Sequence, residues 1–205
     1  MPNDLLVDPY NLIITGVGGQ GNVMTSRTIG NMLAVQGYFV TIGETFGASQ
    51  RGGSVMSHLR ISAKSSWSPQ IPLGKANMVV SMEPSETIRV LKDFGNEKVK
   101  VITNTRPFLP VGVISGQLNY PSGDEIRQWI GEMTDAAWFL NATEEAVKIG
   151  PAVLGNIIMA GALAGSGDLP LDKSVFEAAT RRRFSGETLD QNLAAFDVGY
   201  GAVAG

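Results

Sequence analysis

A glycine-rich turn near the amino terminus constrains the fold of this chain more than any other segment. The sequence Gly-Val-Gly-Gly-Gln-Gly at residues 16–21 follows a short apolar run at 11–15, which predicts a strand. After the turn, apolar residues recur at helical spacing over residues 22–36, and Gly37 ends this predicted helix. A glycine turn between a buried strand and a helix is typical of α/β folds that bind a ligand beyond the end of the strand.

Apolar runs that predict strands alternate with helical segments along the rest of the chain. We expect further strands at 38–42, 54–61, 76–82, 99–103 and 136–140, with a polar loop at 44–53. Helices are expected at about 84–92 and 124–133 and over the C-terminal quarter. This alternation predicts a single α/β domain over residues 1–205, with its core at about 10–200. Its architecture is Rossmann-like: a doubly wound, mostly parallel sheet with helices on both faces.

Composition excludes several kinds of site. The 205 residues include no cysteine and one histidine, His58, so the chain alone cannot build a disulfide, an iron–sulfur cluster or a multi-histidine metal site. Sixteen Lys and Arg residues against 19 Asp and Glu residues give a net charge of −3, which argues against a nucleic-acid-binding protein. His58 lies in a predicted strand, where we interpret it as a structural residue.

The sequence carries no pattern that favours a membrane or an exported protein. The amino-terminal residues lack the basic and apolar regions of a secretory signal. Residues 149–167 carry no charge, but Pro151 and several glycines interrupt this stretch, which favours a helix buried in the core or at a subunit interface over a membrane span. We therefore expect a cytoplasmic protein that contacts no membrane.

The glycine turn permits three interpretations. Its first, third and sixth positions match the G-x-G-x-x-G pattern of dinucleotide-binding folds, in which N–H groups at the helix start attract a phosphate. Glu44 follows at a spacing that suits a ribose-binding acid. The turn can therefore hold NAD or FAD, hold another phosphate-bearing ligand such as coenzyme A, or hold nothing. The candidate cofactor-binding residues of this region are Gly16, Gly18, Gly19, Gln20, Gly21 and Glu44.

A second loop places an amide and a guanidinium before two glycines. In the sequence Ser-Gln-Arg-Gly-Gly-Ser at 49–54, Arg51 is suited to grip a carboxylate or a phosphate with two parallel hydrogen bonds. Arg51 is the best catalytic candidate in the chain, with Gln50 beside it. The alternative for an isolated motif of this kind is a solvated loop with an exposed arginine.

Taken together, these motifs resemble the gamma-type domain of the 2-oxoacid:ferredoxin oxidoreductases, and most of all the beta subunit of the indolepyruvate type. The resemblance rests on the order of 16–21, Glu44, 49–54, the strand segment Ser57-His58-x-Arg60 and the segment Asn104-Thr105-Arg106-Pro107. It spans about residues 10–200. It adds Ser49, Gly52, Gly53 and Asn104 to the residues expected to line a pocket for an anionic acceptor.

The resemblance implies a non-thiamine subunit that is not active alone. In this family thiamine diphosphate, Mg and iron–sulfur clusters lie in partner polypeptides, here a large alpha subunit, and ferredoxin takes up the electrons. The implied reaction is oxidative decarboxylation of a 2-oxo acid, such as indolepyruvate or another aryl pyruvate, to an acyl-CoA. Coenzyme A is then the ligand expected near this chain, and no metal is expected in it. A stand-alone NAD- or FAD-binding oxidoreductase and a non-catalytic structural or regulatory subunit remain as alternatives.

Overall fold

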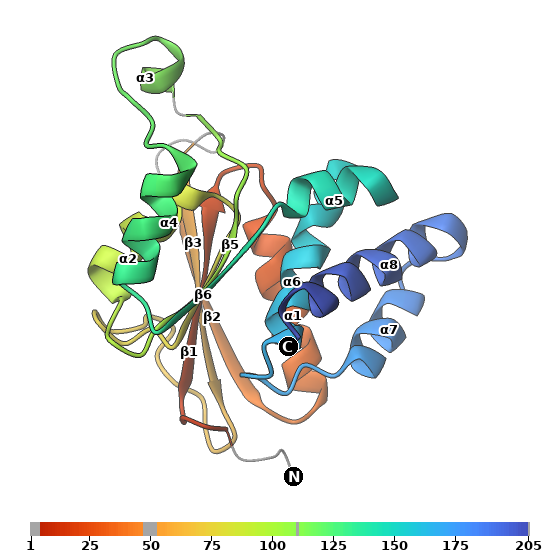
Figure 1. Cartoon of the computed structure of the whole chain (residues 1–205). Coiled ribbons are helices and arrows are strands. Elements are labelled where there is room, and N and C mark those ends of the chain that lie inside the picture. The colour runs from red at the N-terminus through yellow and green to blue at the C-terminus, as the bar shows by residue number, and fades with distance from the viewer. Residues whose placement is uncertain (1–4, 47–52, 110, 205) are drawn as a thin grey trace.

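A six-stranded sheet runs through the centre of the computed structural model, which describes residues 5–46, 53–109 and 111–204 (Figure 1). Its order is β2-β3-β1-β4-β5-β6, with β1 parallel to β4, β4 to β5 and β5 to β6, and with β3 antiparallel to both β1 and β2. The expected mostly parallel sheet is therefore confirmed. The strands are β1 (Tyr10–Val17), β2 (Phe39–Phe46), β3 (Ser54–Ser62), β4 (Met78–Ser81), β5 (Lys100–Asn104) and β6 (Ala136–Leu140).

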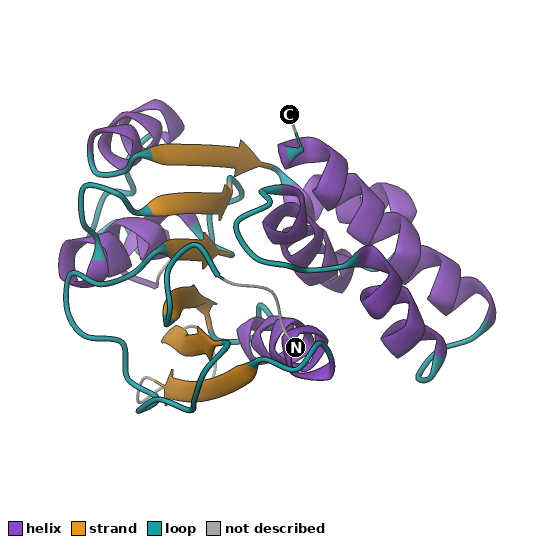
Figure 2. Cartoon of the chain, turned by 90° about the horizontal axis from the view of Figure 1, so that it is seen from below, coloured by secondary structure: helices purple, strands orange, loops and turns teal. Residues whose placement is uncertain are grey.

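Helices cover both faces of this sheet, as the sequence predicts (Figure 2). On one face lie α2 (Pro84–Phe94) and α4 (Gly123–Glu132). The other face carries α1 (Asn22–Val35), α5 (Ala142–Ile149), the 3-10 turn η1 (Ala152–Leu154), α6 (Gly155–Gly165), α7 (Lys173–Arg181) and α8 (Gly186–Val203). The short α3 (Val111–Ile114) lies at the end of a loop that extends away from the sheet.

The apolar strands supply a separate core to each helical layer. Ile13, Val79 and Val101 point to the α2 side, where they pack in one cluster with Val90 and Ile130. The alternate strand residues Leu12, Ile14 and Val80 point to the other side of the sheet. There they form the larger cluster with residues of α1, α6 and α8: Ile29, Leu33, Ile158, Leu163 and Phe196. Burial on both faces explains why these strands read as nearly continuous apolar runs.

The second strand is longer than the sequence predicts and lies at the edge of the sheet. Residues 44–46, which the sequence places in a loop, belong to β2, because β2 pairs with β3 from Phe39 opposite Ser62 to Phe46 opposite Val55. Glu44 is half-buried on this edge strand, and an edge strand tolerates such polar residues. The neighbour of β1 on this side is β3 and not β2.

The uncharged stretch of the sequence is buried within the chain. Helix α6 packs against α1, α8 and β5, and a Cβ added to Gly161 would lie 2.1 Å from the carbonyl oxygen of Phe196 in α8. A Cβ added to Gly199 would lie 1.8 Å from the carbonyl oxygen of Ile158. The structure therefore assigns this helix to the core, one of the two expected locations. In the described part of the chain, no helix has the length and apolarity of a membrane span.

Candidate functional site

The two glycine-rich loops meet at the carboxyl edge of the sheet. Because β3 is antiparallel to β1, the start of β3 lies beside the end of β1, with Val17 opposite Ser54. The N–H group of Gly18 donates to the carbonyl oxygen of Gly53 over 2.7 Å, which links the two loops directly. Ser49, Gln50, Arg51 and Gly52 lie outside the described residues.

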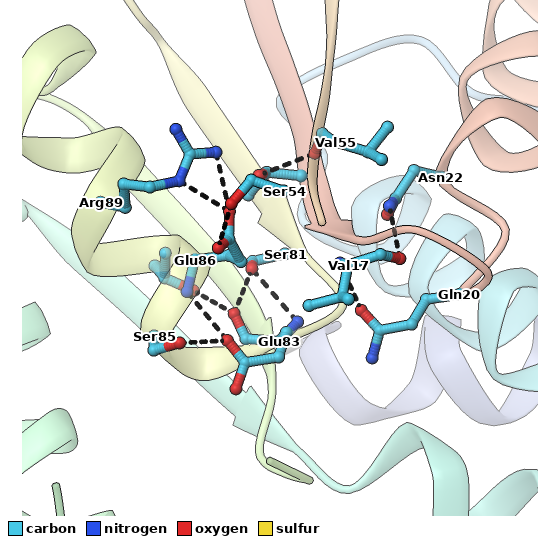
Figure 3. A network of polar contacts seen from close by, with 12 residues as sticks. Val17, Gln20, Asn22, Ser54, Val55, Ser81, Glu83, Ser85, Glu86 and Arg89 are labelled. Carbon is cyan, nitrogen blue, oxygen red and sulfur yellow. Dashed lines mark hydrogen bonds and ion pairs between the residues drawn. The ribbon is translucent and has the colours of Figure 1, made fainter. Parts of the chain in front are cut away.

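Most of the first turn is packed by the chain itself. Gln20 folds back, so that its Oε1 accepts from the Val17 N–H at 2.8 Å (Figure 3). Its Nε2 donates to the Met82 carbonyl at 3.3 Å. Its amide therefore joins β1 to the end of β4. A Cβ on Gly16 would lie 2.8 Å from Gln20 Oε1, so this glycine is required for the close approach.

The last glycine of the turn matches the dinucleotide-binding pattern, but a side chain of the protein covers the position that a phosphate would take there. Gly21 has φ +86° and precedes α1 directly, and a Cβ on it would lie 2.0 Å from Nδ2 of Asn156. A ligand that approached Gly21 would have to displace this amide. Gly19, with φ +103°, has open space where its Cβ would stand. Gly19 and its neighbour Gln20 are the residues of the turn that line a cavity.

A cavity of about 470 Å³ opens beside Gly19, between the turn, the end of β5 and the starts of α5 and α6. This volume is within the range of small-molecule sites. Among the residues that the structure describes, Arg106 is the one charged residue that lines it, so the local charge suits an anion. The polar lining residues are Gln20, Asn104, Arg106, Thr143 and Asn156.

Asn104 lies at the floor of this cavity with an unused acceptor. Its Nδ2 donates to the Met82 carbonyl and to Thr143 Oγ1, both at 3.1 Å. Its Oδ1 is buried and has no partner among the described residues. A buried amide oxygen without a partner is costly, which makes this atom a candidate acceptor for a ligand N–H or O–H group.

Glu44 lies outside this cavity. Its carboxylate is 3.9 Å from Nε of Arg27 on α1, and β3 separates its strand from β1. A ribose-binding acid needs a strand beside the glycine turn, and the intervening β3 denies Glu44 that position. The structure therefore brings Gly19, Gln20 and Asn104 together and leaves Glu44 apart.

A buried carboxylate that sequence reasoning missed holds the loop next to the cavity. Glu83 lies between β4 and α2 and is fully buried; its Oε2 accepts from the Glu86 N–H at 2.9 Å and from Ser85 Oγ at 2.6 Å, which caps α2 (Figure 3). Its Oε1 accepts from the Phe108 N–H at 3.3 Å and from the Tyr120 hydroxyl. Glu83 thus fixes both ends of the loop that carries α3.

The start of β3 is anchored to the opposite helical layer. Ser54 Oγ donates to Glu86 Oε1 at 2.7 Å, and Arg89 forms an ion pair with Glu86 Oε2 at 2.7 Å. Burial, followed by the hydrogen bond to Glu83, raises the pKa of Tyr120, so this phenol stays a donor. These contacts fix the frame of the cavity but do not line it.

His58 is a structural residue, as the sequence analysis favours. Its side chain is buried on β3, its Nδ1 accepts from the Ile71 N–H at 3.3 Å, and its ring meets Phe94 edge to face at 5.2 Å between ring centres. Burial lowers the pKa of His58, which keeps the imidazole neutral.

Comparison with known families assigns this fold. The family described as Pyruvate ferredoxin/flavodoxin oxidoreductase matches residues 11–202, which is nearly the whole chain. The chain belongs to this family. Within it, the chain is 37% identical over 190 residues to the Indolepyruvate oxidoreductase subunit IorB of Archaeoglobus fulgidus, with 93% of each chain covered. It is 35% identical to the subunit of that name from Methanothermobacter thermautotrophicus, with 95% of this chain and 98% of the other covered.

Solved structures support the same fold for this member of the oxidoreductase family. The pyruvate oxidoreductase subunit PORC of Thermotoga maritima superposes with a TM-score of 0.72 at 18% identity, covering 95% of this chain and 97% of that chain. The 2-oxoglutarate:ferredoxin oxidoreductase of Magnetococcus marinus, solved with coenzyme A bound, gives a TM-score of 0.74 at 18% identity. It covers 96% of this chain and 31% of that longer chain. The chain is thus an IorB-like subunit of the 2-oxoacid:ferredoxin oxidoreductase family.

A sequence motif of this family member contains some of the residues that line the cavity, but no motif marks the others. Asn104 and Arg106 both lie in the motif at 104–107, although only Asn104 is predicted to bind a ligand. Asn156 and Thr143 come from the helical segments, where a polar side chain carries no positional signal. They reach the cavity because α5 and α6 both start at the carboxyl edge.

Proposed function

We propose that this chain is the non-thiamine subunit of an oxidoreductase that decarboxylates indolepyruvate or another aryl pyruvate oxidatively. The observation that supports this proposal is the similarity, over nearly the whole length of the chain, to curated subunits named for indolepyruvate. Its partners in the proposal are a large alpha subunit, which holds thiamine diphosphate, Mg and iron–sulfur clusters, and ferredoxin as electron acceptor. The cytoplasm is the compartment that we predict for this complex.

We further propose that the cavity beside Gly19 holds coenzyme A. Three features support it: the open backbone at Gly19, the Arg106 cation with no acidic lining residue, and the free acceptor Oδ1 of Asn104. A guanidinium suits a phosphate oxygen, and an amide oxygen suits an N–H or O–H donor. Coenzyme A, when bound, supplies the thiol that accepts the acyl group.

In this proposal the residues of the chain bind and orient the acceptor and do not handle the 2-oxo acid. Arg106 neutralises charge at the mouth of the cavity, while Asn104 and Gln20 are held rigidly by their bonds to the Met82 carbonyl. A polar floor that is fixed before the ligand arrives loses little entropy on binding. Arg51 and Gln50 remain proposed contacts to the acceptor or to the active site of the partner.

The test measures steady-state kinetics of the assembled complex with the variants Arg106→Gln and Arg51→Ala. For Arg106→Gln we expect the KM for coenzyme A to rise roughly tenfold, with the KM for the 2-oxo acid unchanged, because one charge-assisted contact to an anion is lost. Arg182→Gln removes an exposed cation that does not line the cavity and serves as control.

Two outcomes would count against the proposal. An unchanged KM for coenzyme A in Arg106→Gln would exclude the cavity as its site, and unchanged acyl-CoA formation in Arg51→Ala would remove Arg51 from the reaction. Copurification tests the partner: a thiamine-binding subunit with cluster cysteines should accompany the chain. Flavin or NAD turnover by the lone chain would instead support an independent oxidoreductase.

A further inference from the structure

A second cavity lies within the helical layer, between α1, α6, α7 and the start of α8. Its volume is about 400 Å³, and it adjoins the first cavity where Val153 and Asn156 line both. Its other walls are different: one comes from α1, one from α7 and one from the beginning of α8. The coenzyme A proposal does not use this space.

The walls of the second cavity are mostly apolar and include aromatic rings and thioethers. Met24 and Met32 on α1 face Phe176 on α7 and Phe184 beyond it. Phe176 is buried and stacks on Phe196 of the core at 4.2 Å between ring centres, so this wall is rigid. Aromatic rings and methionine sulfur both pack favourably on a flat aromatic guest.

One cation lies at the cavity, and no acid opposes it. Of the described residues that line it, Arg183 alone is charged. Arg183 forms no ion pair with any residue that the structure describes, whereas Arg181 pairs with Glu177 at 2.7 Å. The guanidinium carbon of Arg183 lies 5.2 Å from the centre of the Phe184 ring, which places its charge next to an aromatic wall.

The end of α7 alone does not explain this arrangement. A cation near the carboxyl end of a helix is favourable, and Arg181 and Arg182 already supply two at that end. Arg183 lies beyond the last turn of α7 and beside an apolar cavity. The dipole of α7 does not account for this position. An unpaired guanidinium at the mouth of an apolar cavity is complementary to an amphipathic anion.

We propose that this cavity binds a small aromatic monocarboxylate, with the ring between the α1 methionines and Phe176 and the carboxylate at Arg183. A cavity of this volume accommodates a one- or two-ring compound, and hydroxyls of Thr28 and Thr188 add hydrogen-bond groups to the wall. The site rests on the cavity and its charge, so it does not depend on the proposed reaction.

The test is calorimetric titration of the full chain with phenylacetate and indole-3-acetate, and with neutral indole for comparison. We expect saturable binding of both acids and at least tenfold weaker binding of indole. Arg183→Gln should weaken both acids roughly tenfold, the cost of one hydrogen bond to a charged group, while leaving indole unchanged. Arg182→Gln, which removes an adjacent cation outside the lining, should bind like the unaltered chain.

A second pair of variants tests the location by filling the space. Ala178 and Ala179 are both exposed on α7, but only Ala179 lines the cavity. Ala179→Trp should abolish binding, and Ala178→Trp should preserve it, with equal thermal stability as evidence that both fold. The proposal is overturned if neither acid binds at millimolar concentration, or if Arg183→Gln or Ala179→Trp binds as well as its control. Loss of coenzyme A affinity in these variants would assign the cavity to coenzyme A instead.

Discussion

At the residue scale, Glu83 and His58 are buried titratable side chains that the proposed chemistry does not use. Glu83 has four hydrogen-bond donors around its carboxylate, and His58 has one backbone donor on Nδ1. Both side chains need hydrogen-bond partners in the folded chain, because a buried polar group that loses its partner destabilises the fold. We therefore predict how a substitution of Glu83 and the protonation of His58 change the free energy of unfolding.

Glu83→Gln should lower the free energy of unfolding by about 2–3 kcal/mol, because the amide nitrogen cannot accept and leaves buried donors without partners. The urea midpoint of the chain measures this change. The same variant should expose the loop at 105–121 to proteolysis, since Phe108 and Tyr120 lose their anchor. The exposed Glu132, which accepts only from Gln128, provides the control Glu132→Gln. Equal midpoints for the two variants would contradict the anchoring role.

His58 should make the chain less stable as the pH falls below 6.5. Burial lowers its pKa in the folded chain, so between the unfolded value of 6.5 and the folded value only the unfolded chain binds the proton. Stability then rises with pH across this window and is level above it. Urea unfolding at pH 7.5 and 5.5 measures the difference, and the imidazole, the only one in the chain, can be titrated directly by NMR.

The control for this pH dependence is His58→Gln, which keeps a polar side chain that does not titrate. Its stability should fall less than that of the unaltered chain between the same two pH values. A decline as steep in His58→Gln, or an NMR titration of His58 at or above pH 6.5, would show that another group is responsible.

Single positions of the site illustrate what sequence can and cannot reveal at this scale. The motif at 104–107 pointed to Asn104, and the structure places it at the cavity floor. Glu44 matched a spacing that has meaning only if its strand lies beside β1, and spacing along a chain does not specify which strands are neighbours. Asn156 carried no signal, because its role depends on packing against Gly21 from a helix 135 residues later.

At the scale of elements, periodicity predicted the parallel strands and their helices well, since the apolar runs of β1, β4 and β5 are buried on both faces. It failed at the pair β2 and β3, where the predicted loop proved to be partly strand. Hydrogen bonding to a neighbouring strand determines where β2 ends, and the apolarity of the local sequence does not indicate this pairing. The direction of β3 was likewise unpredictable, because a strand reads the same in either direction.

The crossing of α6 and α8 yields a prediction with a matched control on one helix. Gly199→Ala should destabilise the chain by about 3 kcal/mol, because the new Cβ would lie 1.8 Å from the Ile158 carbonyl oxygen and force the helices apart. Gly201 lies two residues later in α8, and a Cβ there would meet nothing within 4 Å. Gly201→Ala should therefore be neutral or stabilising by up to about 1 kcal/mol, through helix propensity.

Thermal unfolding of the two alanine variants measures the contrast. Unfolding of Gly199→Ala at a temperature close to that of Gly201→Ala would contradict the close approach of the two helices. The comparison also tests the assignment of the uncharged stretch to the core. If this stretch lay at a subunit interface instead, Gly199→Ala would disturb assembly and leave the isolated chain intact.

At the scale of the whole molecule, the proposed site and the polar contacts of Asp168 lie at opposite edges of the sheet. The carboxyl edge carries the glycine turn, the cavity and the starts of α1, α5 and α6. At the amino edge, Lys100 of β5 and Tyr10 of β1 both bond to Asp168, in the connection between α6 and α7. The sheet is thereby joined to the helical layer at a point where no ligand has to enter.

This tie predicts a coupled loss of stability. Asp168 is nearly buried, with Lys100 Nζ at 2.8 Å and the Tyr10 hydroxyl at 3.1 Å, and burial together with the Asp168 charge raises the pKa of Tyr10. Asp168→Asn should cost about 1–3 kcal/mol, because it removes a charge-assisted bond. Lys100→Met should cost less, since Tyr10 still donates to the carboxylate.

A double-mutant cycle measures whether the two side chains act together. The combined variant should be more stable than the sum of the single losses predicts, by about 1 kcal/mol, because the second substitution removes a group that the first has already left unpaired. Lys148→Met, which breaks an exposed ion pair with Glu145 on α5, should change stability little and serves as the control. Strict additivity in the cycle would mean that Lys100 and Asp168 stabilise the chain independently of each other.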